Sequence, residues 1–332
     1  MKNIAIVGAT GAVGLEMLAV LQRRHFPVGS LKLLASERSA GWRRLEFSGQ
    51  QIPVEALTED SFAGVDIALF SAGGRVSKQF APLAVAAGCV VVDNSSAFRM
   101  DERVPLVIPE INPGDIRAHQ GIIANPNCTT VITLMALYPL HKAFGVRRIF
   151  AASYQAVSGT GAKAIEEFKL QLLAYQQGGA PNAVVYPHPI AFNVLPHVGE
   201  FLKSGYSEEE MKMQNEGRKI MSHRHFLASM TCVRVPVFRA HSVAVSAQFK
   251  RPVTVEAACA VLAKMPGLDV VDDPASNLYP MPLSVAGKDT CAVGRLRVDS
   301  VWANRGLSFW VSGDQLLKGA ALNAVQIAEL LL

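Results

Sequence analysis

Three glycines near the start of the chain constrain its fold more than any other feature. Lys2 to Ala9 predicts a buried strand, which runs into Gly8, Gly11 and Gly14 before a helical pattern over 15–24. Glycines at such a turn let the backbone approach a diphosphate at the helix N-terminus. The spacing is G-x-x-G-x-x-G rather than the commoner G-x-G-x-x-G, but its place between a strand and a helix indicates a dinucleotide-binding fold.

Alternating strands and helices follow this turn. Strands are expected over 31–36, 66–72, 89–94 and 121–124, with a helix over 76–87. This order predicts an α/β fold, a doubly wound parallel sheet of the Rossmann type. Ligands of such sheets bind at the carboxyl ends of the strands, where Gly8 and Cys128 both fall.

The pattern changes after Arg147. Long alternating strands are expected over 148–156, 231–238, 242–250, 291–299 and 307–312, and helices over 161–177, 207–222 and 255–264. Antiparallel pairing is the natural expectation for alternating strands. The sequence therefore predicts a second, α+β domain, followed by one apolar helix over 315–332.

Composition excludes several classes of protein. Half of the 332 residues are hydrophobic, and the net charge of +5 is spread without long basic runs, so we expect no nucleic-acid partner. No apolar segment reaches the roughly 18 residues of a membrane span. Five widely spaced cysteines form no metal-binding pattern, and a strand beginning at Lys2 leaves no room for a signal peptide. We expect a cytoplasmic protein without a metal.

Cys128 is the candidate nucleophile. It lies in Asn125-Pro126-Asn127-Cys128-Thr129-Thr130, directly before the apolar stretch 131–140. N–H groups at a helix N-terminus favour the thiolate and could hold an oxyanion after sulfur attacks a carbonyl. The alternative is an inert cysteine packed as a small hydrophobe.

The end of the second expected strand bears on the choice of dinucleotide. Ser36, Arg38 and Ser39 suit the 2′-phosphate of NADP, whereas Glu37 would favour NAD. The arginine between two serines makes NADP the prediction. A solvated surface loop is the alternative.

Six further residues are candidates for binding or catalysis. Arg99 offers a forked donor to phosphate or carboxylate, and Gln155 could orient a reacting carbonyl near Ser158 and Gly159. Arg234 lies among valines in a strand and is costly unless paired, and His241 could serve as acid and base beside a cysteine. Glu216 and Lys219 share a helix face, so they could bind a substrate's charges or form a plain surface ion pair.

Together these residues resemble the aspartate-semialdehyde dehydrogenase family nearly end to end. The matching segments are GATGAVG at 8–14, SERSAG at 36–41, DNSSAFR at 93–99, NPNCTT at 125–130, SYQAVSGTGAKA at 153–164, CVRVPV at 232–237, PLSVAGKD at 282–289 and KGAALNAVQIAE at 318–329. Asn-Cys-Thr at the cysteine separates the chain from acetylglutamyl-phosphate reductases, which carry Gly-Cys-Tyr.

The resemblance implies NADPH-dependent reductive dephosphorylation of L-aspartyl 4-phosphate to aspartate semialdehyde and phosphate, in lysine, threonine, methionine and diaminopimelate biosynthesis. It implies an NADP domain over 1–127, to which the helix 315–332 returns. It also implies a catalytic and dimerisation domain over 128–314, of the glyceraldehyde-phosphate-dehydrogenase C-terminal type, in a homodimer or homotetramer.

The resemblance also assigns roles to residues. Cys128 would form a thioester, His241 would act as acid and base, and Gln155 would help to stabilise the oxyanion. Arg99 and Lys219 would hold phosphate, Arg234 the α-carboxylate and Glu216 the α-ammonium. The implied cofactor contacts are Gly8, Thr10, Gly11, Ala12, Val13, Ser36, Arg38, Ser39, Ser71, Ser158, Gly159 and Asn323.

Three positions depart from the family's pattern. Ala240-His241-Ser242-Val243 replaces the usual Gly-His-Ser-Glu, Trp42 replaces a lysine, and Gly217 replaces a threonine. The missing glutamate could have oriented the histidine or tuned its pKa. Two alternatives stay open, a non-catalytic paralogue that acts as a binding or assembly partner, and an acyl-phosphate reductase with another substrate.

Overall fold

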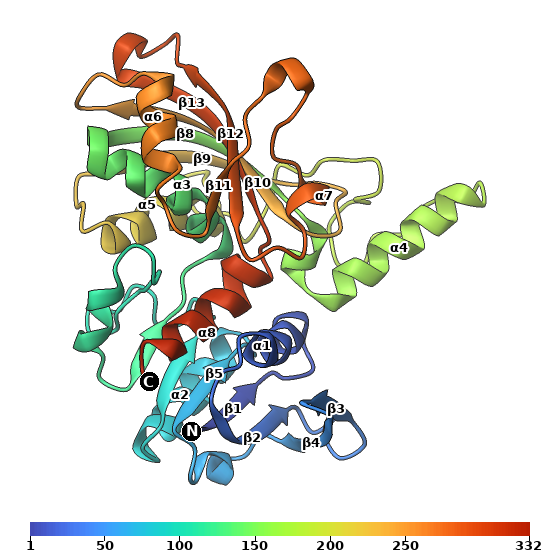
Figure 1. Ribbon diagram of the computed structural model, residues 1–332. Coiled ribbons are helices and arrows are strands. Elements are labelled where there is room, and N and C mark those ends of the chain that lie inside the picture. Colours follow the sequence, from blue (N-terminus) through green and yellow to red (C-terminus); the bar gives the residue numbers. More distant parts are fainter. The chain divides into compact units, whose positions relative to one another are not determined.

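The computed structural model describes all residues, 1–332, and the chain divides into two compact units. The first comprises Met1–Asn127 and Ala320–Leu332, and the second Cys128–Gly319. Each unit is built around one sheet (Figure 1). None of the helices combines the length and the hydropathy that a membrane-spanning helix requires.

The first unit holds a seven-stranded sheet in the order β3-β4-β2-β1-β5-β6-β7. Its strands are β1 (Lys2–Val7), β2 (Val28–Ala35), β3 (Arg44–Phe47), β4 (Gln50–Ala56), β5 (Ile67–Phe70), β6 (Val90–Asp93) and β7 (Ile122–Ala124). All pairs are parallel except β3 with β4. The predicted parallel sheet is confirmed, but the β3–β4 hairpin was not foreseen.

Helices cover both faces of this sheet. The helices are α1 (Ala12–Arg23), α2 (Gly74–Ala86) and α8 (Leu322–Glu329). Ala81 and Ala84 of α2 pack with Ala5 and Val7 of β1. Neighbouring strand residues point to opposite faces. The other face is left to α1 and α8, which contact each other, while α8 also contacts β5 and β6.

The second unit holds a six-stranded sheet in the order β11-β12-β13-β10-β8-β9. Its strands are β8 (Val146–Gln155), β9 (Leu227–Arg234), β10 (His241–Phe249), β11 (Leu268–Val270), β12 (Cys291–Val298) and β13 (Gly306–Gly313). Antiparallel pairing was expected, but β8 with β9 and β11 with β12 are parallel. The reason is the connection, because the long helical segment after β8 crosses over before β9 begins.

Helices of the second unit are α3 (Cys128–Phe144), α4 (Ala162–Gln176), α5 (Glu208–Ile220), α6 (Val255–Leu262) and α7 (Pro282–Val285). The first turns of α3 are buried without a break from Thr129 to Leu137, as expected of a helix that is apolar all round. It contacts β10 and β13 on one side and α5 and α6 on others. Cys128 therefore begins the central helix of its unit.

The expected single helix over 315–332 is wrong in extent. A π-helix over Leu317–Ala321 precedes α8, and the boundary between the units falls within it, at Gly319. π-Turns often occur at functional sites, because they redirect side chains without ending a helix. Here the turn brings Gly319 against Cys128, since an added Cβ on Gly319 would lie 2.8 Å from the Cys128 Cβ.

Candidate functional site

The glycine turn of the first unit leaves no room for side chains. Gly8 has φ +88°, and a Cβ there would lie 2.4 Å from the Ser71 carbonyl oxygen. A Cβ on Gly14 would lie 2.2 Å from the Gly8 carbonyl oxygen. Gly11 caps α1, and no side chain there accepts a hydrogen bond from the first turn. The N–H groups of this turn, which includes Thr10, Ala12 and Val13, therefore suit an anion.

The loop after β2 lies beside this turn, because the Gly8 N–H donates to the Leu34 carbonyl at 2.8 Å. Ser36 and Arg38 are exposed, and Ser39 is half-buried. Trp42, which replaces the usual lysine, donates its indole N–H to the Arg38 carbonyl at 3.2 Å. Trp42 therefore contacts only the backbone of Arg38, and the Arg38 guanidinium stays exposed.

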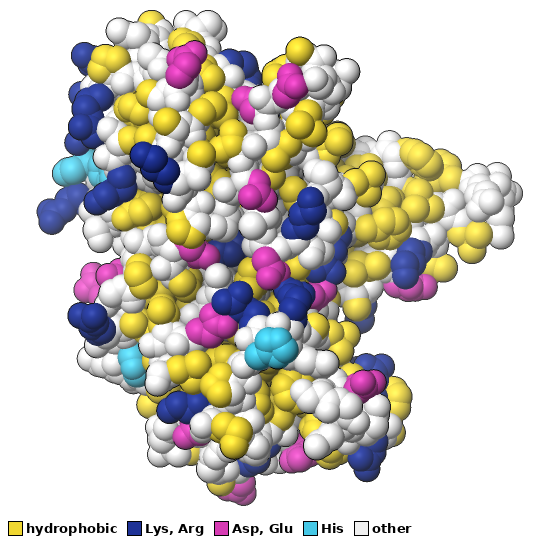
Figure 2. Space-filling model, in the orientation of Figure 1, with side chains coloured by type: hydrophobic (Ala, Val, Ile, Leu, Met, Phe, Trp, Pro, Cys, Tyr) yellow, Lys and Arg dark blue, Asp and Glu magenta, His cyan; other side chains and the backbone are white.

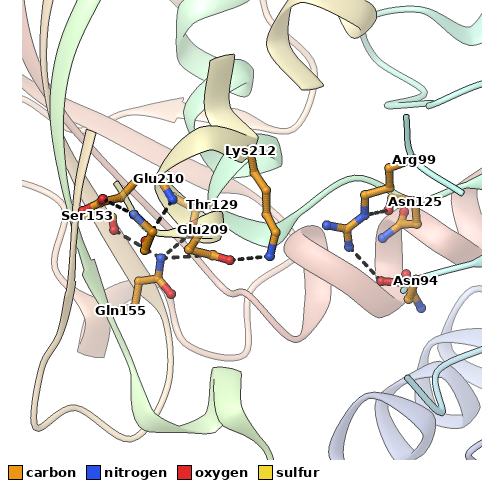
Figure 3. A network of polar contacts seen from close by, with 10 residues as sticks. Asn94, Arg99, Asn125, Thr129, Ser153, Gln155, Glu209, Glu210 and Lys212 are labelled. Atoms are coloured by element: carbon orange, nitrogen blue, oxygen red, sulfur yellow. Dashed lines mark hydrogen bonds and ion pairs between the residues drawn. The ribbon is translucent and has the colours of Figure 1, made fainter. Parts of the chain in front are cut away.

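Arg99 belongs to a buried polar group in the first unit. Its Nε donates to the Asn125 carbonyl at 2.9 Å and its Nη2 to the Asn94 carbonyl at 2.8 Å (Figure 3). Asn323, which is fully buried, donates from Nδ2 to Asn125 Oδ1 at 2.6 Å and to the Val107 carbonyl at 3.0 Å. These bonds tie the C-terminal helix to this group.

Asn94 closes the expected strand over 89–94, where the sequence makes it a candidate to line the cofactor cleft. Both polar atoms of its side chain are buried without a hydrogen-bond partner. Such an orphaned amide calls for an explanation, and an absent ligand is one. It lies directly after β6, at the carboxyl end of a parallel strand, where ligands of such sheets bind.

In the second unit, Gln155 ends β8 beside the start of α3. Its Nε2 lies 3.0 Å from Thr129 Oγ1, 3.2 Å from Ser153 Oγ and 3.3 Å from Glu209 Oε1 (Figure 3). Both amide hydrogens therefore have acceptors within the protein. The expected donation from Gln155 to an oxyanion does not fit this arrangement, and the N–H groups at the start of α3 are the remaining donors.

His241 begins β10 and is fully buried. The Ala156 N–H donates to His241 Nδ1 at 3.0 Å, so in the neutral ring the proton is on Nε2. Burial, chiefly, and the Arg234 guanidinium lower the pKa of His241 to about 3, against the Glu209 carboxylate, which raises it. The ring is therefore neutral at pH 7 and holds one proton at Nε2, which has no partner in the protein.

Arg234 ends β9 beside this histidine. Its Nη1 donates to the Ala156 carbonyl at 2.8 Å, and its guanidinium carbon lies 5.8 Å from the centre of the Tyr186 ring. Its Nε is buried without a partner. A Cβ on Gly159 would lie 3.1 Å from both Arg234 Nη1 and His241 Nε2, so Gly159 borders the space that these two atoms face.

Ser158 has a different setting from the one predicted for a cofactor contact. It is buried, and its hydroxyl accepts a hydrogen bond from Gln315 Nε2. The Gln315 Oε1 accepts from the Ala240 N–H at 2.8 Å. Gln315 therefore joins the loop after β8 to the residue that precedes His241.

Glu216 and Lys219 lie on α5, as predicted, but Glu216 is only 2% exposed. A plain surface ion pair therefore does not describe Glu216. Gly217 replaces the usual threonine where a Cβ would lie 3.0 Å from the Phe226 ring. This substitution accommodates Phe226 and leaves the neighbouring Glu216 in place.

The comparisons with known proteins agree along the whole chain. The family model described as Semialdehyde dehydrogenase, NAD binding domain, matches residues 3–119, and the model described as Semialdehyde dehydrogenase, dimerisation domain, matches residues 137–318. Aspartate-semialdehyde dehydrogenases of Synechocystis and Aquifex aeolicus are each 52% identical, covering 99% of this chain and 97% of theirs.

Solved structures point to the same family. Aspartate semialdehyde dehydrogenase II of Vibrio cholerae, complexed with ASA, superposes with a TM-score of 0.97 at 43% identity, covering 100% of this chain and 98% of its own. The Candida albicans enzyme with NADP has a TM-score of 0.77 at 25% identity, covering 100% and 98%. The chain therefore belongs to the aspartate-semialdehyde dehydrogenase family, as its motifs predicted.

Proposed function

We propose that this protein catalyses the NADPH-dependent reductive dephosphorylation of L-aspartyl 4-phosphate to aspartate semialdehyde. The observation that carries the proposal is the set of residues around the start of α3. Cys128 begins that helix, Gln155 is bonded to Thr129 next to it, and a neutral His241 lies beside Arg234. A non-catalytic paralogue would have no need to keep this set together in a chain that belongs to the family.

The chemistry follows from these groups. The Cys128 sulfur bonds to the acyl carbon, the carbon–oxygen bond to phosphate breaks, and phosphate leaves a thioester on the enzyme. N–H groups at the start of α3 stabilise the oxyanion, and the neutral His241 donates a hydrogen bond from Nε2–H to the reacting groups. The sulfur attacks as a thiolate and leaves as a thiolate when the aldehyde is released. When bound, the dinucleotide supplies the hydride.

The substrate groups are assigned by charge. Arg234, whose Nε lacks a partner, takes the α-carboxylate, and the buried Glu216 takes the α-ammonium. Arg99 and Lys219 are the cations for phosphate. The Glu216 assignment favours an amino-acid substrate over an acyl phosphate without an ammonium, because only the amino acid offers this carboxylate a positive charge.

We assign the dinucleotide to the first unit, over 1–127 with the returning α8. The backbone over Gly8–Val13 leads into the first turn of α1, whose N–H groups have no side-chain cap and suit the diphosphate, and Ser71 adjoins this turn. Arg38 between Ser36 and Ser39 suits a 2′-phosphate. Asn323 acts through Asn125, to which it is bonded. Ser158 is bonded to Gln315, and Gly159 lies beside His241. We therefore assign Ser158 and Gly159 a role in shaping the catalytic end of the second unit.

The reverse reaction tests the proposal. Purified protein should reduce NADP⁺ when given aspartate semialdehyde and inorganic phosphate, and should reduce NAD⁺ much less. Cys128→Ser should lose nearly all of this activity, whereas Cys259→Ser, a half-buried thiol on α6, is the matched control. An active Cys128→Ser enzyme would rule out the thioester, and absence of phosphate-dependent turnover in the wild type would rule out the function.

The surface supports self-association, and we propose a homodimer or homotetramer in the cytoplasm. Hydrophobic side chains gather on the arm that α4 forms, where Leu170, Leu173 and Tyr175 are exposed (Figure 2). Phe150 on β8 is also exposed and stacks on Trp302. Exposed apolar surface of this extent is typical of association sites. All five cysteines are thiols, which fits a reducing compartment.

A further inference from the structure

Exposed cations gather at the end of the second unit where α3 and β10 end. Because Cys128 begins α3 and His241 begins β10, this end lies opposite to the catalytic residues. The cations come from the end of α3, the start of β8, the loop after α5 and the residues after β10, and they are Lys142, Arg147, Arg224, Lys250 and Arg251. No ion pair joins any of these five, the basic cluster, to a carboxylate of the protein.

Hydrogen bonds hold the segments of the basic cluster together. The Lys250 N–H donates to the carbonyl of the single residue between α3 and β8 at 2.8 Å, and the Arg251 Nη2 donates to the Lys142 carbonyl at 3.3 Å. In the loop after α5, His223 Nε2 lies 2.9 Å from the Val146 carbonyl oxygen at the start of β8. The fold therefore gathers on one surface cations that the sequence keeps apart.

Two stacked histidines lie within the basic cluster and respond to its charge. The ring centres of His141 and His223 are 4.9 Å apart. Burial, chiefly, and the nearby charges of His223, Lys250 and Lys142 lower the pKa of His141 to about 4, and no carboxylate acts in the opposite direction. His141 Nδ1 is buried without a hydrogen-bond partner. The protein therefore leaves the positive charge at this end uncompensated.

Neither helix stability nor the proposed reaction accounts for the basic cluster. A cation in the last turn of a helix interacts favourably with the macrodipole, but this applies only to Lys142 on α3. Lys142 also lies about 20 Å along α3 from Cys128, at 1.5 Å per residue. The five charges equal the net charge of +5 of the whole chain, so the positive excess of the protein is concentrated here. Such a concentration attracts multivalent anions.

We propose that the basic cluster binds a chain of linked phosphates. Guanidinium groups donate in pairs to phosphate oxygens, and lysines add compact charges. Neighbouring strands lie about 4.8 Å apart, so cations at the adjoining ends of β8 and β10 can contact successive phosphates of one chain. The ligand is an inorganic polyphosphate or the phosphates of a nucleotide, and the site is separate from the proposed reaction.

Calorimetric titration of the whole protein with sodium tripolyphosphate tests the proposal. Saturating NADP⁺ is present throughout, so that the dinucleotide site is occupied. Lys142→Gln with Lys250→Gln should weaken tripolyphosphate binding by about 100-fold, because each replacement removes a charged hydrogen bond that contributes about 10-fold. Lys169→Gln with Lys203→Gln, two exposed lysines outside the basic cluster, is the matched control and should bind as the wild type does.

The same titration with magnesium-free ATP distinguishes the two sources of a phosphate chain. Tighter binding of ATP than of tripolyphosphate would identify a nucleotide, and equal or weaker binding an inorganic chain; both results support the site if the Lys142/Lys250 variant loses them. Absence of binding by both compounds, or binding that the cluster variant retains as fully as the control variant, would overturn the proposal. The measurement does not involve Cys128, so its failure leaves the Cys128→Ser test untouched.

Discussion

The neutral, buried state of His241 makes the stability of the enzyme depend on pH in a direction that can be worked out. In the unfolded chain a histidine binds a proton near pH 6.5, whereas burial and Arg234 lower the pKa of folded His241 to about 3. Between these values the unfolded state binds the proton and the folded state does not. Stability is therefore lost as the pH falls from about 6.5 toward 3.

The size of the loss follows from linkage. From pH 7 to pH 5, a histidine whose pKa falls from 6.5 to about 3 on folding costs about 2 kcal/mol of unfolding free energy. His141, which stacks on His223, has a pKa lowered to about 4, chiefly by burial, and adds a smaller loss because its ring is only partly buried and solvent screens it. Replacing His241 with glutamine should therefore remove more than half of the drop that these two residues cause.

Urea unfolding at pH 7, 6 and 5, followed by tryptophan fluorescence, measures this difference. From pH 7 to pH 5, the unfolding free energy of His241→Gln should fall by about 2 kcal/mol less than that of the wild type, and that of His141→Gln should differ from the wild type by a smaller amount. Replacement of the exposed His188 is the control and should leave the fall unchanged. If the unfolding free energies of His241→Gln and the wild type fall by the same amount between pH 7 and pH 5, the folded His241 ring carries a charge. Its assignment as a neutral Nε2–H donor is then refuted.

Two further predictions concern the residues that frame this centre. Ala240, directly before His241, has φ +75°, a conformation that favours glycine. Ala240→Gly should therefore raise the unfolding free energy by about 0.5–1 kcal/mol in the same urea assay. An unfolding free energy equal to or below that of the wild type would show that no strain is stored at this position. Gly319→Ala should push its Cβ against the Cys128 Cβ, 2.8 Å away, and lower kcat by roughly 100-fold. Unchanged kcat would mean that the π-turn yields without moving the cysteine.

Sequence reasoning succeeded where local chemistry determines structure. The turn at Gly8 needs a positive φ and close backbone contacts, so its glycines could be interpreted without the rest of the fold. Cys128 was placed at a helix start because a loop sequence precedes a long apolar run, and α3 begins there. Ser207 and Glu210 form the capping box that starts α5 close to where the periodicity placed it.

Sequence reasoning failed where contacts between distant segments of the chain determine the structure. The β3–β4 hairpin turns at Ser48 and Gly49, both with positive φ, but its strands are short and mostly exposed and leave little hydrophobic pattern. The parallel pairing of β8 with β9 depends on a crossover, and strand alternation alone does not reveal it. Glu209 lies in the acidic turn 208–210, and only the folded structure shows that it faces Gln155.

The burial of Val243, which replaces the usual glutamate, explains how this substitution affects His241. Val243 is fully buried two residues after His241, on the same face of β10, and it pairs with Ser153 and Val311. A carboxylate there would have to be satisfied inside the core, which costs several kcal/mol without partners. The charge that opposes Arg234 at the His241 ring comes from Glu209 on α5 instead. The histidine therefore keeps an acidic neighbour, although its own strand no longer provides one.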